Sequence, residues 1–255
     1  MRRIDLNSDL GEGFGPWSMG DDEAMLGLVT SANIACGGHA GDTETMFRTL
    51  STAARNGVVV GAHPGYLDRE GFGRRIIPMT PAETGRLVAA QVGALAAVAA
   101  LVPVEVAYVK PHGALGNLAA RDRDVARAIV EAVVCQGDLG ILAISGTELE
   151  RAARESGATV YSEVFADRGY QPDGQLVPRD RPGAMIDDPD EAADRLLRFL
   201  HTGMMPVVDG DPIELAAHSV CVHGDSAGAV AMARLLRERL IADGVEVVAF
   251  SAAGS

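Results

Sequence analysis

The chain has 255 residues, of which 47% are apolar, and its formal net charge is −13 at pH 7. This length suits one domain with a large buried core, and we find no linker, so we expect a single domain over residues 1–255. The acidic balance argues against a nucleic-acid partner, because phosphate backbones are bound by clustered basic side chains. Three cysteines without a Cys-x-x-Cys pair are typical of the reducing cytoplasm, where we expect the protein to reside.

Strand-like and helix-like segments alternate along the chain. Short apolar or alternating segments, which predict strands, cover residues 4–10, 31–36, 58–63, 104–110, 140–145, 159–165 and 219–222. Helical patterns cover residues 22–29, 43–56, 81–101, 122–135, 147–156, 188–201 and 226–243. This alternation predicts an α/β fold with a parallel sheet. Seven such units favour a closed or nearly closed β/α barrel, although a doubly wound open sheet has the same alternation.

One of the predicted helices imitates a membrane span. Within residues 87–104 the only strongly polar side chain is Gln91. Alanine, its commonest residue at seven of the 18 positions, contributes little transfer free energy per residue, and Pro103 interrupts its end. We therefore expect a buried helix here and no membrane association.

Polar side chains gather where the predicted strands end. In both candidate folds the carboxyl ends of parallel strands form one face, and ligands bind there. The residues in question are Asn7, Asp9, Glu12, Asn33, His39, His63, Lys110, His112, Glu163, Asp167, Arg168, His223 and Asp225. We expect them to meet in a single cleft.

Lys110 is the single lysine among 22 basic residues. Arginine is a planar, permanently charged fork, whereas lysine is a compact point charge that reaches into a small site. Lys110 follows the apolar run 106–109 and precedes Pro111-His112-Gly113, as a buried strand does when it enters an active-site loop. We predict that a confined pocket needs an ammonium here; the alternative is chance survival at a surface position.

The first predicted strand is dense in carboxylates at alternating spacing. Period two places Asp5, Asn7 and Asp9 on one face, where they are costly inside a barrel unless they bind something. The alternative is an edge strand that turns these groups to solvent. Crowded carboxylates raise one another's pKa, and such crowding is typical of an acid/base pair or a cation site.

Four of the six histidines each follow an apolar strand and adjoin glycine or proline. They are His39, His63, His112 and His223. Histidine suits both metal ligation and proton transfer near neutral pH. The patterns His-x-x-x-His and His-Glu-x-x-His are absent, so the sequence assigns no metal. The other two histidines, His201 and His218, lack this context and are predicted to be structural.

Arginines in two motifs are candidates for holding an anion. Arg74 and Arg75 end the segment 71–75, and Arg168 ends the segment 165–168. Paired hydrogen bonds from a guanidinium suit a carboxylate or a phosphate. The chain has neither a P-loop nor a dinucleotide-binding glycine motif.

Seven of these segments together resemble one family over nearly the whole chain. They are residues 5–15 (DLNSDLGEGFG), 31–42 (SANIACGGHAGD), 61–66 (GAHPGY), 71–75 (GFGRR), 109–115 (VKPHGAL), 163–168 (EVFADR) and 221–225 (CVHGD). They are similar, in order, to the family of 5-oxoprolinase A subunits, also called LamB/YcsF-like. The resemblance implies a distorted β/α barrel akin to that of the polysaccharide deacetylases. It also implies ATP-dependent opening of 5-oxoproline to L-glutamate, with ATP hydrolysed to ADP and phosphate, together with two other 5-oxoprolinase subunits.

The resemblance also suggests roles for individual residues. Those expected to be catalytic are Asp9, Glu12, His63, Lys110 and His112. Those expected to bind substrate are Asn7, Asn33, His39, Arg74, Arg75, Asp167, Arg168, His223 and Asp225. A lactam is a stable amide, so its carbonyl needs activation, for example by phosphorylation from ATP, before water attacks. A carboxylate or histidine activates that water, and Lys110 or the arginines neutralise charge.

Two other functions stay open at this point. One is a metal-dependent amidohydrolase or deacetylase that needs no ATP, with Asp9, His39 and His63 as possible ligands of a divalent metal. The other is a non-catalytic subunit that presents 5-oxoproline to its partners. The absence of a P-loop favours an unorthodox ATP site, or one shared with a partner. The long segment 168–182 is the candidate for a docking loop.

Overall fold

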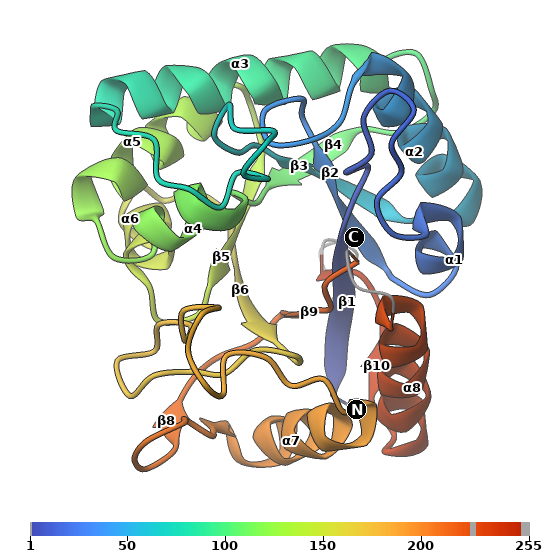
Figure 1. The fold of residues 1–255 in the computed structure, drawn as a ribbon, viewed down its shortest axis with the longest axis vertical. Coiled ribbons are helices and arrows are strands. Elements are labelled where there is room, and N and C mark those ends of the chain that lie inside the picture. The colour runs from blue at the N-terminus through green and yellow to red at the C-terminus, as the bar shows by residue number, and fades with distance from the viewer. Residues whose placement is uncertain (1, 225–227, 251–255) are drawn as a thin grey trace.

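Seven parallel strands close into a barrel in the computed structural model, which describes residues 2–224 and 228–250 (Figure 1). The strands are β1 (Arg3–Leu10), β2 (Ser31–Ala35), β3 (Val59–His63), β4 (Val106–Val109), β5 (Gly140–Ile144), β6 (Val160–Phe165) and β9 (Ser219–Cys221). Neighbours in this order pair with each other, and β9 also pairs with β1 along residues 5–7, which closes the ring. All seven predicted strands are confirmed, and the open-sheet alternative is wrong.

Helices surround the barrel. They are α1 (Asp22–Leu26), α2 (Thr43–Asn56), α3 (Pro81–Ala99), α4 (Gly113–Ala119), α5 (Arg123–Val134), α6 (Glu148–Glu155), α7 (Pro189–Thr202) and α8 (Ala229–Ala242). Local sequence sets several of their ends. The Thr80 and Glu83 side chains form a capping box at the start of α3, and Gly57 ends α2 in the left-handed conformation at φ 65°.

Four short elements were not predicted. β7 (Met204–Met205) and β8 (Ile213–Glu214) form a small antiparallel ribbon, and β10 (Glu246–Val247) pairs with the start of β1. A two-residue strand is too short for any periodic pattern to reveal it. Helix α4 follows His112 directly and begins without a side-chain cap, so the usual start signal is missing there.

Helix α3 contains the segment that imitates a membrane span. Its buried side chains include Val88, Gln91, Val92 and Leu95, which recur every three or four residues and form one face. The predicted buried helix is confirmed. Among the described residues, no helix is long and apolar enough to cross a bilayer.

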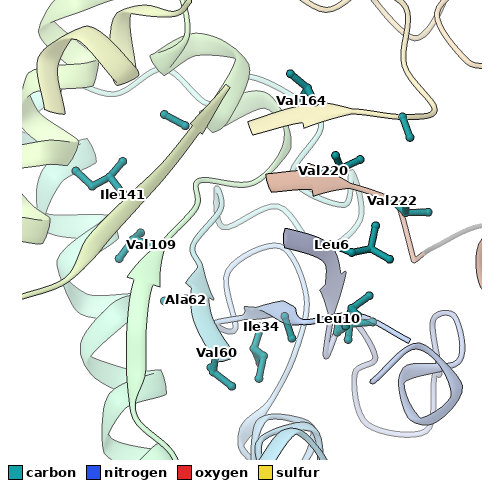
Figure 2. Close-up of a cluster of buried hydrophobic side chains, with 14 of the residues drawn as sticks. Leu6, Leu10, Ile34, Val60, Ala62, Val109, Ile141, Val164, Val220 and Val222 are labelled. Carbon is teal, nitrogen blue, oxygen red and sulfur yellow. The ribbon is translucent and has the colours of Figure 1, made fainter. Parts of the chain in front are cut away.

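The strands alternate between an apolar outer face and a polar inner face. Buried apolar side chains lie around the ring of strands and form the main core with the helices (Figure 2). Ten of them are Leu6, Leu10, Ile34, Val60, Ala62, Val109, Ile141, Val164, Val220 and Val222. Asp5 and Asn7 on the opposite face of β1 are fully buried. The predicted inward face of β1 is thus confirmed, and the solvent-facing alternative is wrong.

A second apolar cluster fills part of the barrel interior. Tyr108, Leu142 and Phe250 form it, and Tyr161 packs against them with its ring centroid 4.0 Å from that of Phe250. Gly61 makes room for the Tyr108 ring, since a Cβ there would lie 2.2 Å from Cε2 of that ring. The polar groups of the interior are therefore confined to one part of the barrel.

Candidate active site

A cavity of about 590 Å³ lies at the carboxyl ends of the strands. Eight of the residues predicted to share one cleft line it: Asp9, Glu12, His63, Lys110, His112, Glu163, Arg168 and His223. Arg74, predicted to bind substrate, lines it too. The segment 171–179 also lines the cavity, so part of the candidate docking loop forms its wall. The prediction of one shared cleft is borne out for these eight residues, and Asp225 lies outside the described residues.

Lys110 is buried among acidic and polar groups, with 5% of its surface exposed. Its Nζ lies 2.9 Å from Oδ1 of Asp9, 2.9 Å from Oε1 of Glu163 and 3.1 Å from Sγ of Cys221. Burial opposes the ammonium charge, but the surrounding acids, Asp9 first, outweigh burial and hold the pKa of Lys110 well above its usual value. The lysine is thus a confined, permanently charged group, and the surface alternative is wrong.

The two carboxylates beside Lys110 differ in their proton affinity. Burial acts to raise the pKa of Asp9, but His63 and Lys110 outweigh it and hold that pKa well below its usual value. Burial raises the pKa of Glu163 although Lys110 opposes the shift, and Oε2 of Glu163 has no hydrogen-bond partner. Glu163 also lines the cavity, as its position at the end of a strand predicted. No catalytic or substrate-binding role was assigned to it from sequence.

Asn7 and Asn33 support these carboxylates without lining the cavity. The Nδ2 of Asn33 donates to Asn7 Oδ1 at 2.7 Å and to Asp9 Oδ1 at 2.8 Å. The Nδ2 of Asn7 donates to Oε1 of Glu163 at 2.9 Å. The hydroxyl of Tyr108 donates to Asn33 Oδ1 at 2.7 Å. The two asparagines therefore orient the acids that contact Lys110, and neither lines the cavity.

Backbone carbonyls set the tautomers of His63 and His112. Nδ1 of His63 faces the carbonyl oxygen of Lys110 at 2.7 Å, and Nε2 of His112 faces that of Phe72 at 2.8 Å. A carbonyl only accepts, so each of these nitrogens carries the hydrogen. The other two ring nitrogens, His63 Nε2 and His112 Nδ1, lie 3.0 Å apart. In the neutral rings both are lone pairs, so the pair needs a shared cation or a proton between them.

Glu12 and His39 complete this cluster. Oε1 of Glu12 lies 3.5 Å from His112 Nδ1 and accepts from His39 Nε2 at 3.0 Å. Burial, followed by repulsion from neighbouring imidazoles, holds the pKa of both His39 and His112 well below the usual value. Nδ1 of His39 is buried without a partner. His39 does not line the cavity, and its observed contact is to the carboxylate of Glu12.

The donor set fits a divalent metal. One ligand atom from each of Glu12, His39, His63 and His112 lies within 4.8 Å of the others. Ligands at about 2.0–2.1 Å from a tetrahedral zinc lie about 3.3 Å from one another, and the separations of 3.0 and 3.5 Å around His112 Nδ1 bracket that value. The cluster differs from the predicted ligand set, because it includes Glu12 and His112. Asp9 is engaged by Lys110 through Oδ1.

The remaining predicted residues fall into two groups. Asp167 does not line the cavity, but its Oδ2 accepts from Nδ1 of His223 at 2.7 Å and so orients that ring. Arg75 does not line the cavity either: it pairs with Asp68, and 63% of its side chain is exposed. The carboxylate of Asp68 thus engages Arg75 outside the cavity.

Among the cavity residues to which the sequence analysis assigned no role are Phe72, Arg121 and Arg179. Arg121 follows the unpredicted helix α4, so no strand-end pattern pointed to it. Arg179 lies in the long segment after β6. His201 and His218, predicted to be structural, lie outside the cavity lining, where His201 pairs with Asp243 and His218 accepts from the backbone of Ser162.

Comparison with known proteins agrees with this geometry. The LamB/YcsF family model matches residues 4–255. A protein of Rhodopseudomonas palustris (strain BisA53), named as the A subunit of 5-oxoprolinase, is 51% identical, over 98% of this chain and 99% of that protein. The crystal structure of a lactam utilization protein from Thermus thermophilus is 42% identical with a TM-score of 0.91, and the match covers 97% of this chain and 99% of that chain.

A solved protein of much lower sequence identity shares the barrel fold. A solved peptidoglycan N-acetylglucosamine deacetylase has a TM-score of 0.51 at 13% identity, and the match covers 98% of this chain and 86% of that chain. At this identity the likeness concerns the fold alone, and it confirms the predicted distorted β/α barrel of the deacetylase type. The family match over nearly the whole length and the half-identical relative place the chain in the LamB/YcsF family.

Proposed function

We propose that this chain is the A-type subunit of a 5-oxoprolinase and that its cavity opens 5-oxo-L-proline to L-glutamate. The names of its relatives support a cyclic-amide substrate. One observation carries the chemistry: the buried ammonium of Lys110 lies beside a cluster in which Nε2 of His63 and Nδ1 of His112 face each other at 3.0 Å. A cation that stabilises an oxyanion and a base that accepts a proton thus meet in one cavity.

Ring opening requires three events that these residues can perform. Water adds to the carbonyl carbon and loses a proton, for which His63 Nε2 and His112 Nδ1 are the available acceptors. Negative charge develops on the oxygens bonded to that carbon, which is the oxygen of the added water when the carbonyl oxygen is phosphorylated, and the ammonium of Lys110 stabilises it. The carbon–nitrogen bond then breaks, and the ring nitrogen takes up the proton that the water released. Asp9 and Glu163 keep Lys110 charged and fixed throughout.

ATP hydrolysis and partner subunits belong to the same proposal. A five-membered lactam is a stable amide, so its carbonyl oxygen needs activation, which phosphorylation by ATP supplies. The chain has no P-loop, which favours a nucleotide site on the two other subunits or one shared with them. Cytoplasmic residence, where ATP is available, fits this proposal.

A bound divalent metal is a second part of the proposal, and the facing ring nitrogens of His63 and His112 favour it. Glu12, His63 and His112 would hold the ion, and His39 would orient the carboxylate of Glu12. Such an ion supplies Lewis-acid chemistry and lowers the pKa of bound water. In that case the imidazole nitrogens bind the ion, and proton acceptance falls to another group of the cavity.

One experiment tests the main proposal. Glutamate and ADP are measured with 5-oxoproline and ATP, using this chain with and without its two partner subunits. We expect both products from the complete complex and little turnover from the chain alone. Full ATP-dependent activity from the chain alone would refute the shared nucleotide site. If the complex forms no glutamate while calorimetry shows that the chain binds 5-oxoproline, a purely binding subunit becomes the better explanation.

Elemental analysis of protein purified without added metal tests whether the chain binds the proposed divalent metal. Stoichiometric zinc or a similar ion, together with ATP-independent lactam or amide hydrolysis, would favour a metal-dependent amidohydrolase. An ion without ATP-independent hydrolysis fits the main proposal. Absence of any bound ion, before and after incubation with zinc, would contradict the assignment of a metal site.

A further inference from the structure

Four arginines line the cavity in addition to the residues used above. They are Arg74, Arg121, Arg168 and Arg179. Of the four acids in the lining, Asp9 and Glu163 contact Lys110 and Glu12 contacts His39, which leaves Asp173. The lining therefore carries five lysine and arginine side chains against four acids, whereas the whole chain carries 22 against 35. A concentration of one charge sign in a cavity attracts ligands of the opposite sign.

A contact along the cavity wall joins the segments that carry three of these arginines, Arg121, Arg168 and Arg179. Arg168 and Arg179 belong to the long segment after β6, and Nε2 of Gln175 in that segment donates to the carbonyl of Ala120 at 3.3 Å. Arg121 is the next residue along the chain from Ala120. The segment after β6 is therefore joined to the end of α4, with an arginine on each side of the junction.

Arg168 gives the clearest evidence that an anion is expected. Only 5% of its surface is exposed, and its guanidinium donates to the carbonyls of Ala184 and Val177 at 3.0 and 2.7 Å. Within residues 2–224 and 228–250, no ion pair of Arg168 is found. Burial, followed by repulsion from Arg179, lowers the pKa of Arg168 to about 10. A buried guanidinium with neutral acceptors is costly unless a ligand supplies the counter-charge.

We propose that this arginine group, Arg74, Arg121, Arg168 and Arg179, binds a phosphoryl group carried by the activated lactam. The inference rests on the proposed function and specifies the form of the substrate that the cavity holds. A carboxylate is satisfied by one bidentate guanidinium, whereas a phosphoryl group offers three terminal oxygens and close to two negative charges. Four guanidinium groups match the second ligand better than the first.

The reaction balances with this ligand. ATP transfers its terminal phosphoryl group to the lactam carbonyl oxygen, which gives ADP and an imidate phosphate. Water adds to the same carbon, the carbon–nitrogen bond breaks with a proton passing to nitrogen, and an acyl phosphate results. A second water then releases inorganic phosphate and leaves glutamate. The arginine group holds the phosphoryl oxygens, while Lys110 and the histidines act at the ring carbon.

Inorganic phosphate is a direct probe of this site. Calorimetry would measure its binding to the purified full-length chain and to the variants Arg179→Gln, Arg121→Gln and Arg168→Gln. Arg55→Gln is the matched control, because Arg55 is exposed on α2 and donates to Thr52 away from the cavity. We expect the control to bind phosphate like the wild type, and each cavity variant to bind at least tenfold more weakly. Arg121 and Arg179 are exposed, so these variants remain informative if Arg168→Gln does not fold.

Three outcomes would overturn the proposal. The first is no phosphate binding, or equal binding by all variants. The second is loss of 5-oxoproline binding, but not of phosphate binding, in the cavity variants, which would assign the arginines to the substrate carboxylate. The third is much tighter binding of ADP than of phosphate through the same arginines, which would assign the site to a nucleotide. Phosphate binding is measured without turnover, so failure of the proposed function would be seen separately in the glutamate assay.

Discussion

The side chain of Gln91 makes both of its hydrogen bonds to the backbone of one residue, Gly65. Its Oε1 accepts from the Gly65 amide at 3.1 Å, and its Nε2 donates to the Gly65 carbonyl at 2.7 Å. Gly65 follows His63 by two residues and packs on His39, where an added Cβ would lie 2.6 Å from Nδ1 of that ring. Gln91, the only strongly polar side chain of residues 87–104, therefore holds the loop on which two histidines of the cluster depend.

We expect Gln91→Leu to lower the free energy of unfolding by about 2–4 kcal/mol, because two buried backbone groups lose their partners. Gln136→Leu is the matched control, since Gln136 is exposed and bonds only to its own helix at Ala132. Urea denaturation of both variants beside the wild type measures the effect. Equal stability of the two variants would show that the loop holds its position without Gln91.

Lys110→Arg is expected to be nearly as damaging as Lys110→Ala. The ammonium fits between Asp9, Glu163 and Cys221, and the larger planar fork has no room for the same contacts. Glutamate formation by the complete complex should fall by roughly 100-fold or more in both variants, as for loss of a group that stabilises an oxyanion. Circular dichroism would establish that the variants fold. Near wild-type turnover by the arginine variant would refute the role of Lys110.

Asp5 predicts a pH dependence of stability. Burial, opposed by the hydroxyls of Ser219, Ser31 and Thr30, raises its pKa from 3.8 to about 6. The folded state thus holds a proton that the unfolded state releases between pH 3.8 and 6, so this group makes stability fall as the pH rises through that window. The shift corresponds to about 3 kcal/mol.

Asp5→Asn removes this ionisation. Its free energy of unfolding relative to the wild type should therefore increase as the pH rises from about 4 to about 7, whatever the offset between the two proteins at the acidic end. Chemical denaturation at a series of pH values measures the difference. A difference that does not change with pH would show that Asp5 titrates normally in the folded protein.

The barrel and much of the site could be predicted because strand periodicity and strand ends are local signals. Lys110 and the histidines each follow an apolar run, and parallel strands bring such positions together. Arg75 shows the limit of this reasoning, since adjacency to Arg74 does not reveal that Asp68 engages Arg75 outside the cavity. Gln91 shows another, because its partner lies 26 residues away and nothing local marks the contact.

The facing nitrogens of His63 and His112 predict a metal-dependent spectroscopic signal. Cobalt(II) added to metal-free protein should bind as a single ion and give visible absorption bands typical of low coordination number. His112→Ala removes the lone pair that lies 3.0 Å from His63 Nε2, so the affinity should fall by roughly 100-fold or more. His201→Ala is the control, because His201 pairs with Asp243 on the surface. If cobalt binds neither protein, or binds the His112 variant as tightly as the control, the two nitrogens share a proton, and the cluster serves as a base without a metal.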